Sequence, residues 1–137
     1  MNKFCVAVLV FTWGASAFAV PARVGHILDG DTFSAAVSLD ADTTVSVRVR
    51  LRNVDTPEMS GDCEYERSRA IAARDRLAEI IPIGSMVELS NVKDDKYLGR
   101  IDANVKNANG ADVGEILIRE KIGRKYNGGK RKPWCKG

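Results

Sequence analysis

The stretch of residues 45–54, VSVRVRLRNV, constrains the fold of this chain more than any other, because apolar and basic residues alternate along it. Alternation with a period of two is typical of a β-strand that buries one face. The inward positions would be Val45, Val47, Val49 and Leu51, and the opposite face would carry Arg48, Arg50 and Arg52. The strand runs into Asp55-Thr56-Pro57-Glu58, a turn that proline stiffens. Taken alone, the stretch is equally compatible with a solvated strand that ends in an ordinary turn.

The pattern on either side predicts four further strands. Residues 23–28 and 32–39 form a β-hairpin around the turn Asp29-Gly30-Asp31 and continue into the strand above. Residues 85–92 and 99–105 read as two more strands, separated by a polar connection. We therefore expect an antiparallel meander of three strands, followed later in the chain by two more.

Two segments are predicted to be helices. Residues 64–81 contain neither glycine nor proline, and Pro82 stops the segment. Asp62 is the expected N-cap of this helix. One helical face collects the apolar residues Ala70, Ala73, Leu77 and Ile80. Residues 112–121 predict a shorter helix with Asp112 as its cap.

Three strands, a helix, two strands and a second helix are the elements of a five-stranded Greek-key barrel of the oligonucleotide-binding (OB) type. The predicted class is mainly β with helices (α+β), with an amphipathic helix after the third strand and a short C-terminal helix. A chain of 137 residues, 45% of them hydrophobic, supports one domain of this kind. Periodicity does not prove that the barrel closes, and a plain α+β sandwich satisfies the same pattern.

Residues 1–19 are predicted to be a signal peptide that is cleaved from this domain. Met1-Asn2-Lys3 is a short positive start, residues 4–19 are uncharged and apolar, and Ala17-Phe18-Ala19 offers a cleavage site. An uncleaved membrane anchor is the alternative, although the run is short for a membrane span. We expect residues 20–137 to be exported to the periplasm or the extracellular medium, as a monomer without stable membrane association.

Export changes the interpretation of the cysteines. Cys5 leaves with the signal peptide, so Cys63 and Cys135 remain as a pair in an oxidising compartment and are predicted to form a disulfide. Two thiols and one histidine, His26, are too few for a structural zinc site.

Charge is unevenly distributed along the predicted mature chain. Residues 20–118 contain 12 basic and 17 acidic residues, whereas residues 119–137 contain 8 basic and 1 acidic. A basic tail suits a polyanionic partner and an acidic cluster suits a bound cation. A tail that only solubilises the end of the chain is the alternative.

Hydrolysis of a phosphodiester would use this combination of side chains. Its transition state calls for fixed positive charge around the phosphoryl oxygens, often a divalent cation, and a carboxylate that orients or deprotonates water. Asp31 and Asp55 supply oxygen ligands if their strands are neighbours. Arg50 and Arg100 can each donate two hydrogen bonds to one phosphate. Each residue alone is a weak signal, so the prediction depends on their co-occurrence.

Three segments together resemble the signature segments of the staphylococcal nuclease (thermonuclease) family, in the same order and with similar separations. They are LDGDT at residues 28–32, RLRNVDTPE at residues 50–58 and DKYLGR at residues 95–100. The tail, YNGGKRKPWC, with Cys63 upstream of it, is similar to that of exported bacterial members.

The resemblance implies an endonuclease that uses calcium to hydrolyse DNA and RNA with little sequence specificity and leaves 3′-phosphate ends. It implies that Ca²⁺ is held by the carboxylates of Asp31 and Asp55 and by the backbone carbonyl of Thr56. Asp29 is similar to an acidic residue near the metal in that family.

The resemblance also implies roles for residues in the second and third segments. Glu58 would be the general base or would orient the attacking water, and Arg50 and Arg100 would clamp the phosphoryl group. Lys96 and Tyr97 resemble residues that contact a substrate phosphate. One residue, Leu98, is inserted after Tyr97 relative to the staphylococcal enzyme, which changes the spacing to Arg100.

Two other classes of function remain open from the residues. The first is a non-catalytic OB-fold protein that binds nucleic acid through a basic groove. A pure binder gains nothing from carboxylates set against a phosphate backbone, which favours the nuclease. The second, an exported structural or inhibitory module, leaves the acidic cluster unexplained.

Overall fold

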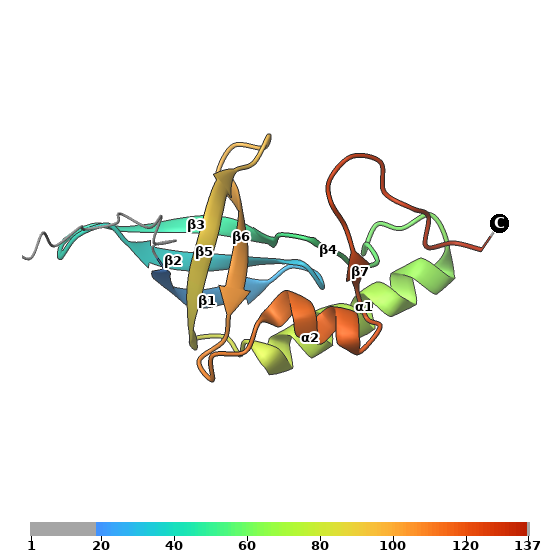
Figure 1. The fold of residues 1–137 in the computed structure, drawn as a ribbon, viewed down its shortest axis with the longest axis horizontal. Helices are drawn as coiled ribbons and strands as arrows, with labels where there is room; N and C mark the ends of the chain where they lie inside the picture. The colour runs from blue at the N-terminus through green and yellow to red at the C-terminus, as the bar shows by residue number, and fades with distance from the viewer. Residues whose placement is uncertain (1–18, 137) are drawn as a thin grey trace, which may run out of the picture.

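The computed structural model describes residues 19–136, which form one barrel with two helices at one end (Figure 1). The predicted signal peptide lies outside these residues, apart from its last residue, Ala19, and its cleavage stays a prediction. None of the helices in the described part of the chain is long and apolar enough to cross a bilayer.

Five strands close into a barrel in the order β1-β2-β3-β6-β5, with β5 pairing again with β1. The strands are β1 (Val20–Ile27), β2 (Thr32–Ser38), β3 (Thr44–Leu51), β5 (Met86–Asp94) and β6 (Arg100–Lys106). All neighbouring pairs are antiparallel except β3 and β6, which run parallel. This closed Greek-key barrel confirms the OB-type prediction and replaces the alternative of an open sandwich.

The alternation along β3 has the predicted effect. Val49 and Leu51 are buried in the barrel, while Arg48 is exposed and Arg50 is half-buried on the other face. The largest fully buried side chains of the core come from the barrel strands and both helices, and they include Val24, Phe33, Leu77, Val87, Leu89, Val105 and Leu117.

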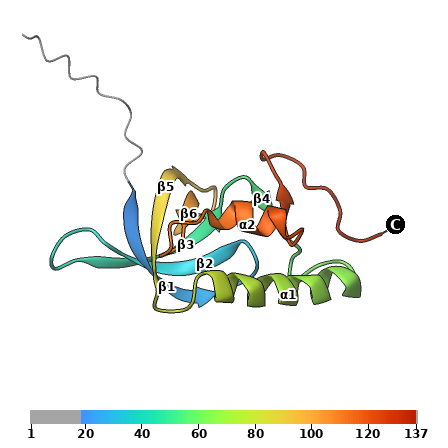
Figure 2. The ribbon, with the colours of Figure 1, turned by 60° about the horizontal axis from the view of Figure 1, so that its bottom comes forward.

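Helix α1 (Glu64–Ile80) buries the predicted apolar face, Ala70, Ala73, Leu77 and Ile80, together with Glu66. Its N-cap is Cys63 and not the predicted Asp62, because Cys63 is the last extended residue before the helix and its Sγ accepts a hydrogen bond from the Glu66 N–H at 3.4 Å. Helix α2 (Val113–Arg119) begins as predicted, with the Asp112 carboxylate accepting from the Glu115 N–H at 2.9 Å. Figure 2 shows both helices extending from the same end of the barrel.

Two short strands were not predicted, β4 (Val54–Asp55) and β7 (Arg124–Lys125), and they pair antiparallel. The predicted strand 45–54 is therefore interrupted at Asn53, whose φ of 66° turns the chain between β3 and β4. Gly123 makes the β4–β7 pairing possible, because a Cβ there would lie 2.6 Å from Val54 Cγ2. This small sheet brings the C-terminal segment alongside the Asp55-Thr56-Pro57-Glu58 turn.

A disulfide joins Cys63 to Cys135, with a Cα–Cα distance of 6.0 Å, as predicted. It attaches the end of the chain to the N-terminus of α1, and the C-terminus accordingly lies beside the start of that helix in Figure 2. The C-terminal segment is thus held at two places, by β7 and by the disulfide.

Candidate active site

Three residues predicted to act at the site, Asp31, Arg50 and Asp55, meet where β2, β3 and β4 adjoin. The β2–β3 register places Thr32 opposite Arg50, and the Leu51 N–H donates to the Asp31 carbonyl at 2.8 Å. Arg50 Nη2 lies 3.7 Å from Asp31 Oδ2 and 4.0 Å from Asp55 Oδ1. Two carboxylates that are 24 residues apart in the sequence therefore face the same guanidinium.

The turn that follows β4 is held by hydrogen bonds on both sides. The Thr56 N–H donates to Asp31 Oδ2 at 3.2 Å, and the Glu58 N–H donates to Glu66 Oε2 on α1 at 3.1 Å. Asp31, Asp55 and Thr56 are buried, whereas half of the Glu58 side chain is exposed. Glu66 was not predicted to take part. Its position three residues after the N-cap is the sequence signal that it lies at the helix start.

A cleft of about 620 Å³ extends from these residues to the β5–β6 hairpin. Its walls carry Asp31, Arg50, Glu58, Lys96, Tyr97 and Arg100, all of which were predicted to act at the site. Arg100 pairs with Asp95 (Nε–Oδ2 3.0 Å) and lies 4.5 Å above the Tyr97 ring. Arg100 therefore faces the same cleft as Arg50 but has a separate carboxylate partner.

The inserted residue, Leu98, is fully exposed at the tip of the β5–β6 hairpin. Gly99 follows it with a φ of 77°, and the Arg100 N–H donates to the Tyr97 carbonyl at 3.2 Å. The hairpin tip thus accommodates the extra residue, and Arg100 still begins β6 and lines the cleft.

Three carboxyl groups in the cleft have shifted pKa values. Burial raises the pKa of Asp29 to about 7, and the charge of Asp31, whose N–H donates to Asp29 Oδ1 at 3.0 Å, adds to the shift. Burial opposes ionisation of Asp95, but Arg100, a side-chain hydrogen bond with Asp102 and the N–H of Tyr97 together outweigh it and lower the pKa of Asp95 to about 2. Burial, reinforced by Asp95, raises the pKa of Asp102, which lies opposite Arg50 on β6. The cleft therefore contains both a firmly ionised carboxylate and carboxyl groups that resist ionisation.

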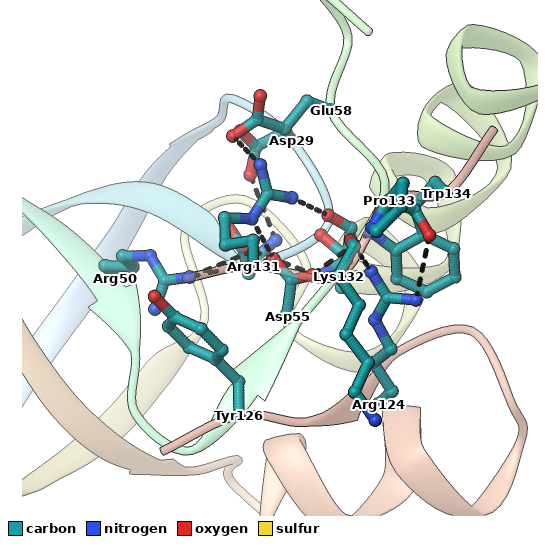
Figure 3. Close-up of polar contacts among 12 residues, drawn as sticks. Asp29, Arg50, Asp55, Glu58, Arg124, Tyr126, Arg131, Lys132, Pro133 and Trp134 are labelled. Atoms are coloured by element: carbon teal, nitrogen blue, oxygen red, sulfur yellow. Dashed lines mark hydrogen bonds and ion pairs between the residues drawn. The ribbon is translucent and has the colours of Figure 1, made fainter. Parts of the chain in front are cut away.

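Arg131, from the C-terminal segment, lies at the centre of the site and was not predicted. Figure 3 shows its guanidinium between Asp55 and Glu58. Nε lies 2.6 Å from Asp55 Oδ1, Nη2 donates to the Thr56 carbonyl at 3.1 Å, and Nη1 lies 2.5 Å from Glu58 Oε1. Partial burial opposes the charge, but these carboxylates outweigh it and raise the pKa of Arg131. The basic C-terminal segment and Cys135 indicated in the sequence that this part of the chain could approach the site, but neither singled out Arg131.

The other oxygen of Asp55 is also engaged by the C-terminal part of the chain. Trp134 Nε1 donates to Asp55 Oδ2 at 3.1 Å, and Arg124 Nη2 lies 3.5 Å from the same atom. The Arg124 guanidinium stacks on the Trp134 ring at 3.9 Å (Figure 3). Because a buried carboxylate is costly without partners, these contacts offset the cost of burying the Asp55 side chain, which is 1% exposed.

The chemistry of the donors fits a hard divalent cation. Asp31 and Asp55 contribute carboxylates, and the Thr56 carbonyl lies beside Asp55, sharing the guanidinium of Arg131 with it. Oxygen donors of this kind are those that calcium and magnesium prefer. Within residues 19–136 no group of three or more His, Cys, Asp or Glu side chains is arranged to hold a metal, so a backbone carbonyl would be needed to complete the set.

Comparison with known proteins identifies relatives that match most of this chain. No family model matches the chain. An uncharacterized endonuclease of Escherichia coli is 31% identical over 120 residues, which span 87% of this chain and 70% of that protein. The chain belongs to the family of that endonuclease. The uncharacterized endonuclease of Escherichia coli O157:H7 is 30% identical over the same length and with the same coverage.

Membership of this family agrees with the class of enzyme predicted from the three segments. The family relationship is a property of the whole chain, whereas Asp31, Arg50, Asp55 and Glu58 are brought together by the barrel and the turn after β4.

Proposed function

We propose that the protein is an exported, calcium-dependent nuclease of the staphylococcal nuclease type, which cleaves DNA, RNA or both with little sequence specificity. The observation that carries this proposal is the convergence of the buried Asp31 and Asp55 on Arg50 in a cleft that a second arginine, Arg100, also lines. The endonuclease names of the relatives support hydrolysis of nucleic acid as the reaction. The disulfide supports export, because such bonds persist in oxidising compartments.

Calcium would be held by the carboxylates of Asp31 and Asp55 and by the carbonyl of Thr56. When bound there, the ion supplies a Lewis acid that offsets the charge on the phosphoryl oxygens.

The remaining chemistry belongs to side chains that line the cleft. Arg50 and Arg100 lie on the adjacent strands β3 and β6, both line the cleft, and hold the phosphoryl group through charge-assisted hydrogen bonds. Glu58, with half of its side chain exposed, orients the attacking water and accepts its proton. Lys96 and Tyr97 hold a neighbouring phosphate.

The products follow from which bond breaks. Water adds to phosphorus and the bond to the 5′ oxygen breaks, so that the phosphate stays on the 3′ end of one fragment. The 5′ oxygen takes a proton and leaves as a hydroxyl on the other fragment. None of these steps requires contact with a base edge, which agrees with low sequence specificity.

The test is an assay of the purified protein on matched single-stranded DNA and RNA, with calcium, magnesium or a chelator. We expect degradation in calcium, loss of activity in the chelator, and fragments with 3′-phosphates by mass spectrometry. We also expect Glu58→Gln and Arg50→Ala to lower kcat/KM by roughly 10²- to 10³-fold, as when one contact to the transition state is lost, with unchanged circular dichroism. Binding without degradation would instead support the non-catalytic alternative, and undiminished activity in the chelator would contradict the calcium assignment.

A further inference from the structure

The C-terminal residues 127–136, here called the tail, return from β7 to the site and carry Arg131 into it (Figures 1 and 3). We propose that the tail is a built-in competitor of the divalent cation, so that Asp55 and Thr56 bind either the Arg131 guanidinium or the cation. This inference rests on the proposed function for the identity of the cation.

The guanidinium of Arg131 uses its whole planar fork on the turn after β4. Its three nitrogens contact Asp55 Oδ1 at 2.6 Å, the Thr56 carbonyl at 3.1 Å and Glu58 Oε1 at 2.5 Å. Two of these acceptors are the oxygens assigned to the cation. Because a guanidinium and a divalent cation repel each other strongly at such distances, both cannot occupy these oxygens together.

The position of Arg131 is specified at several points along the tail. Gly128 and Gly129 adopt φ values of 89° and 79°, which glycine tolerates best, and turn the tail back toward the site. Arg124 donates to the carbonyls of Lys132 and Pro133 and stacks on Trp134. The disulfide then attaches Cys135 to the start of α1. The tail is therefore a defined structure, and its place against Asp55 does not depend on Arg131 alone.

Contacts from the tail stabilise the buried Asp55 carboxylate when no cation is bound. The Asp55 side chain is 1% exposed, so it requires a positive partner whenever no cation is bound. Arg131 and Trp134 supply hydrogen bonds to both of its oxygens. The disulfide keeps them at a high effective concentration, as a short tether does for any second binding group.

The decisive experiment is a calorimetric titration of calcium into the protein and its variants. We expect Arg131→Gln to tighten calcium binding at least about tenfold, because the apparent Kd equals the intrinsic Kd divided by the fraction of molecules in which the tail has left the site. Lys130→Gln, which removes the same charge from the exposed neighbouring residue, should leave the Kd within about twofold of wild type. Unchanged or weaker calcium binding by Arg131→Gln would overturn the proposal.

Two further variants distinguish the contribution of the planar guanidinium from that of its charge and from that of the disulfide. Arg131→Lys keeps the charge but replaces the planar fork by a compact ammonium group, so we expect a Kd between those of wild type and Arg131→Gln. In the double variant Cys63→Ser/Cys135→Ser the tail is untethered, and we expect tighter calcium binding than in wild type. Serine at position 63 still caps α1, so the helix start is retained. A double variant that binds calcium no more tightly than wild type would contradict the role of the disulfide.

Trp134 provides a direct signal of tail release. The chain contains two tryptophans, Trp13 and Trp134, and Trp13 lies in the predicted signal peptide, so Trp134 is the single tryptophan of the mature protein. We expect calcium to shift its fluorescence with the same midpoint as the calorimetric titration, since the indole leaves Asp55. Saturating calcium binding with no change in Trp134 emission would show that the tail stays docked, contrary to the proposal.

A parallel nuclease assay separates failure of this inference from failure of the proposed function. If hydrolysis depends on calcium but the Kd for calcium is the same in wild type and Arg131→Gln, the competition by the tail is contradicted and the proposed function is retained. Absence of hydrolysis, with tighter calcium binding by Arg131→Gln, would do the reverse. If no form binds calcium and Arg131→Gln abolishes chelator-resistant hydrolysis, the competition is wrong and Arg131 is a permanent catalytic cation.

Discussion

The carboxylate of Asp55 is almost fully buried, yet it has arginines on both sides, Arg50 from the barrel and Arg124 and Arg131 from the C-terminal part of the chain. In low dielectric each contact is strong, and losing any one leaves charge uncompensated. At the scale of single residues, the charge of Asp55 is therefore compensated by three arginines together and not by any one of them.

Asp29 offers a test of this balance through pH. Its pKa is about 7 in the folded protein against an ordinary value of 3.8, so folding disfavours its ionised form. Its contribution to stability is thus complete below about pH 4 and is lost as the pH rises toward 7. Asp29→Asn cannot ionise, so the stability advantage of the variant over wild type should grow between pH 4 and pH 7 and then level off. Urea denaturation in the presence of a chelator measures the difference in unfolding free energy between Asp29→Asn and wild type. A difference that does not change with pH would contradict the shifted pKa of Asp29.

At the scale of elements, the β4–β7 pair determines where the tail begins. It is only two residues long on each side, and it forms because Gly123 lets the chain pass close to Val54. Neither strand is visible as a period in the sequence, since two residues cannot establish alternation.

We expect Gly123→Ala to destabilise the protein by about 1–3 kcal/mol, because the added Cβ meets Val54 Cγ2 at 2.6 Å and the Asp55 carbonyl at 3.3 Å in a packed region. Gly114→Ala is the matched control. Its Cβ would have no neighbour closer than 3.5 Å, and within α2 alanine is favoured over glycine by about 1 kcal/mol. Chemical denaturation of both variants measures the difference, and equal stabilities would show that β4 and β7 tolerate separation.

At the scale of the whole molecule, the disulfide closes a loop with a sequence separation of 72 residues, including α1, both strands of the β5–β6 hairpin and α2. The disulfide thus fixes the last residues of the chain beside the start of α1, near the middle of the sequence. The disulfide and β7 hold the two ends of the tail, and the tail is thereby kept beside the site.

Removal of that covalent link should destabilise the whole domain. In the chain-entropy treatment a loop of this length is worth about 4 kcal/mol, which native strain would reduce. We therefore expect Cys63→Ser/Cys135→Ser to lower the unfolding free energy by about 2–4 kcal/mol in urea. The reduced wild-type protein should behave in the same way, and a midpoint equal to that of the oxidised protein would contradict this contribution.

The sequence by itself determined the features that depend on neighbours along the chain. The alternation at Val49 and Leu51, the buried face around Ala73 and Leu77, and the pairing of Cys63 with Cys135 were all predicted and are present. Local periodicity and the count of cysteines are sufficient for these, because each reflects one element or one pair. The short motifs also indicated that Asp31, Arg50 and Glu58 belong to one site, and all three line the same cleft.

The tertiary structure alone decided what occupies that site. Arg131 contacts Thr56 across 75 residues of sequence, and Trp134 contacts Asp55 across 79. Contacts between residues so far apart leave no period and no spacing in the sequence, since they arise only when barrel closure, the β4–β7 pair and the disulfide act together. The buried Asp55 carboxylate requires positively charged partners, and the fold places one of them, Arg131, on the tail.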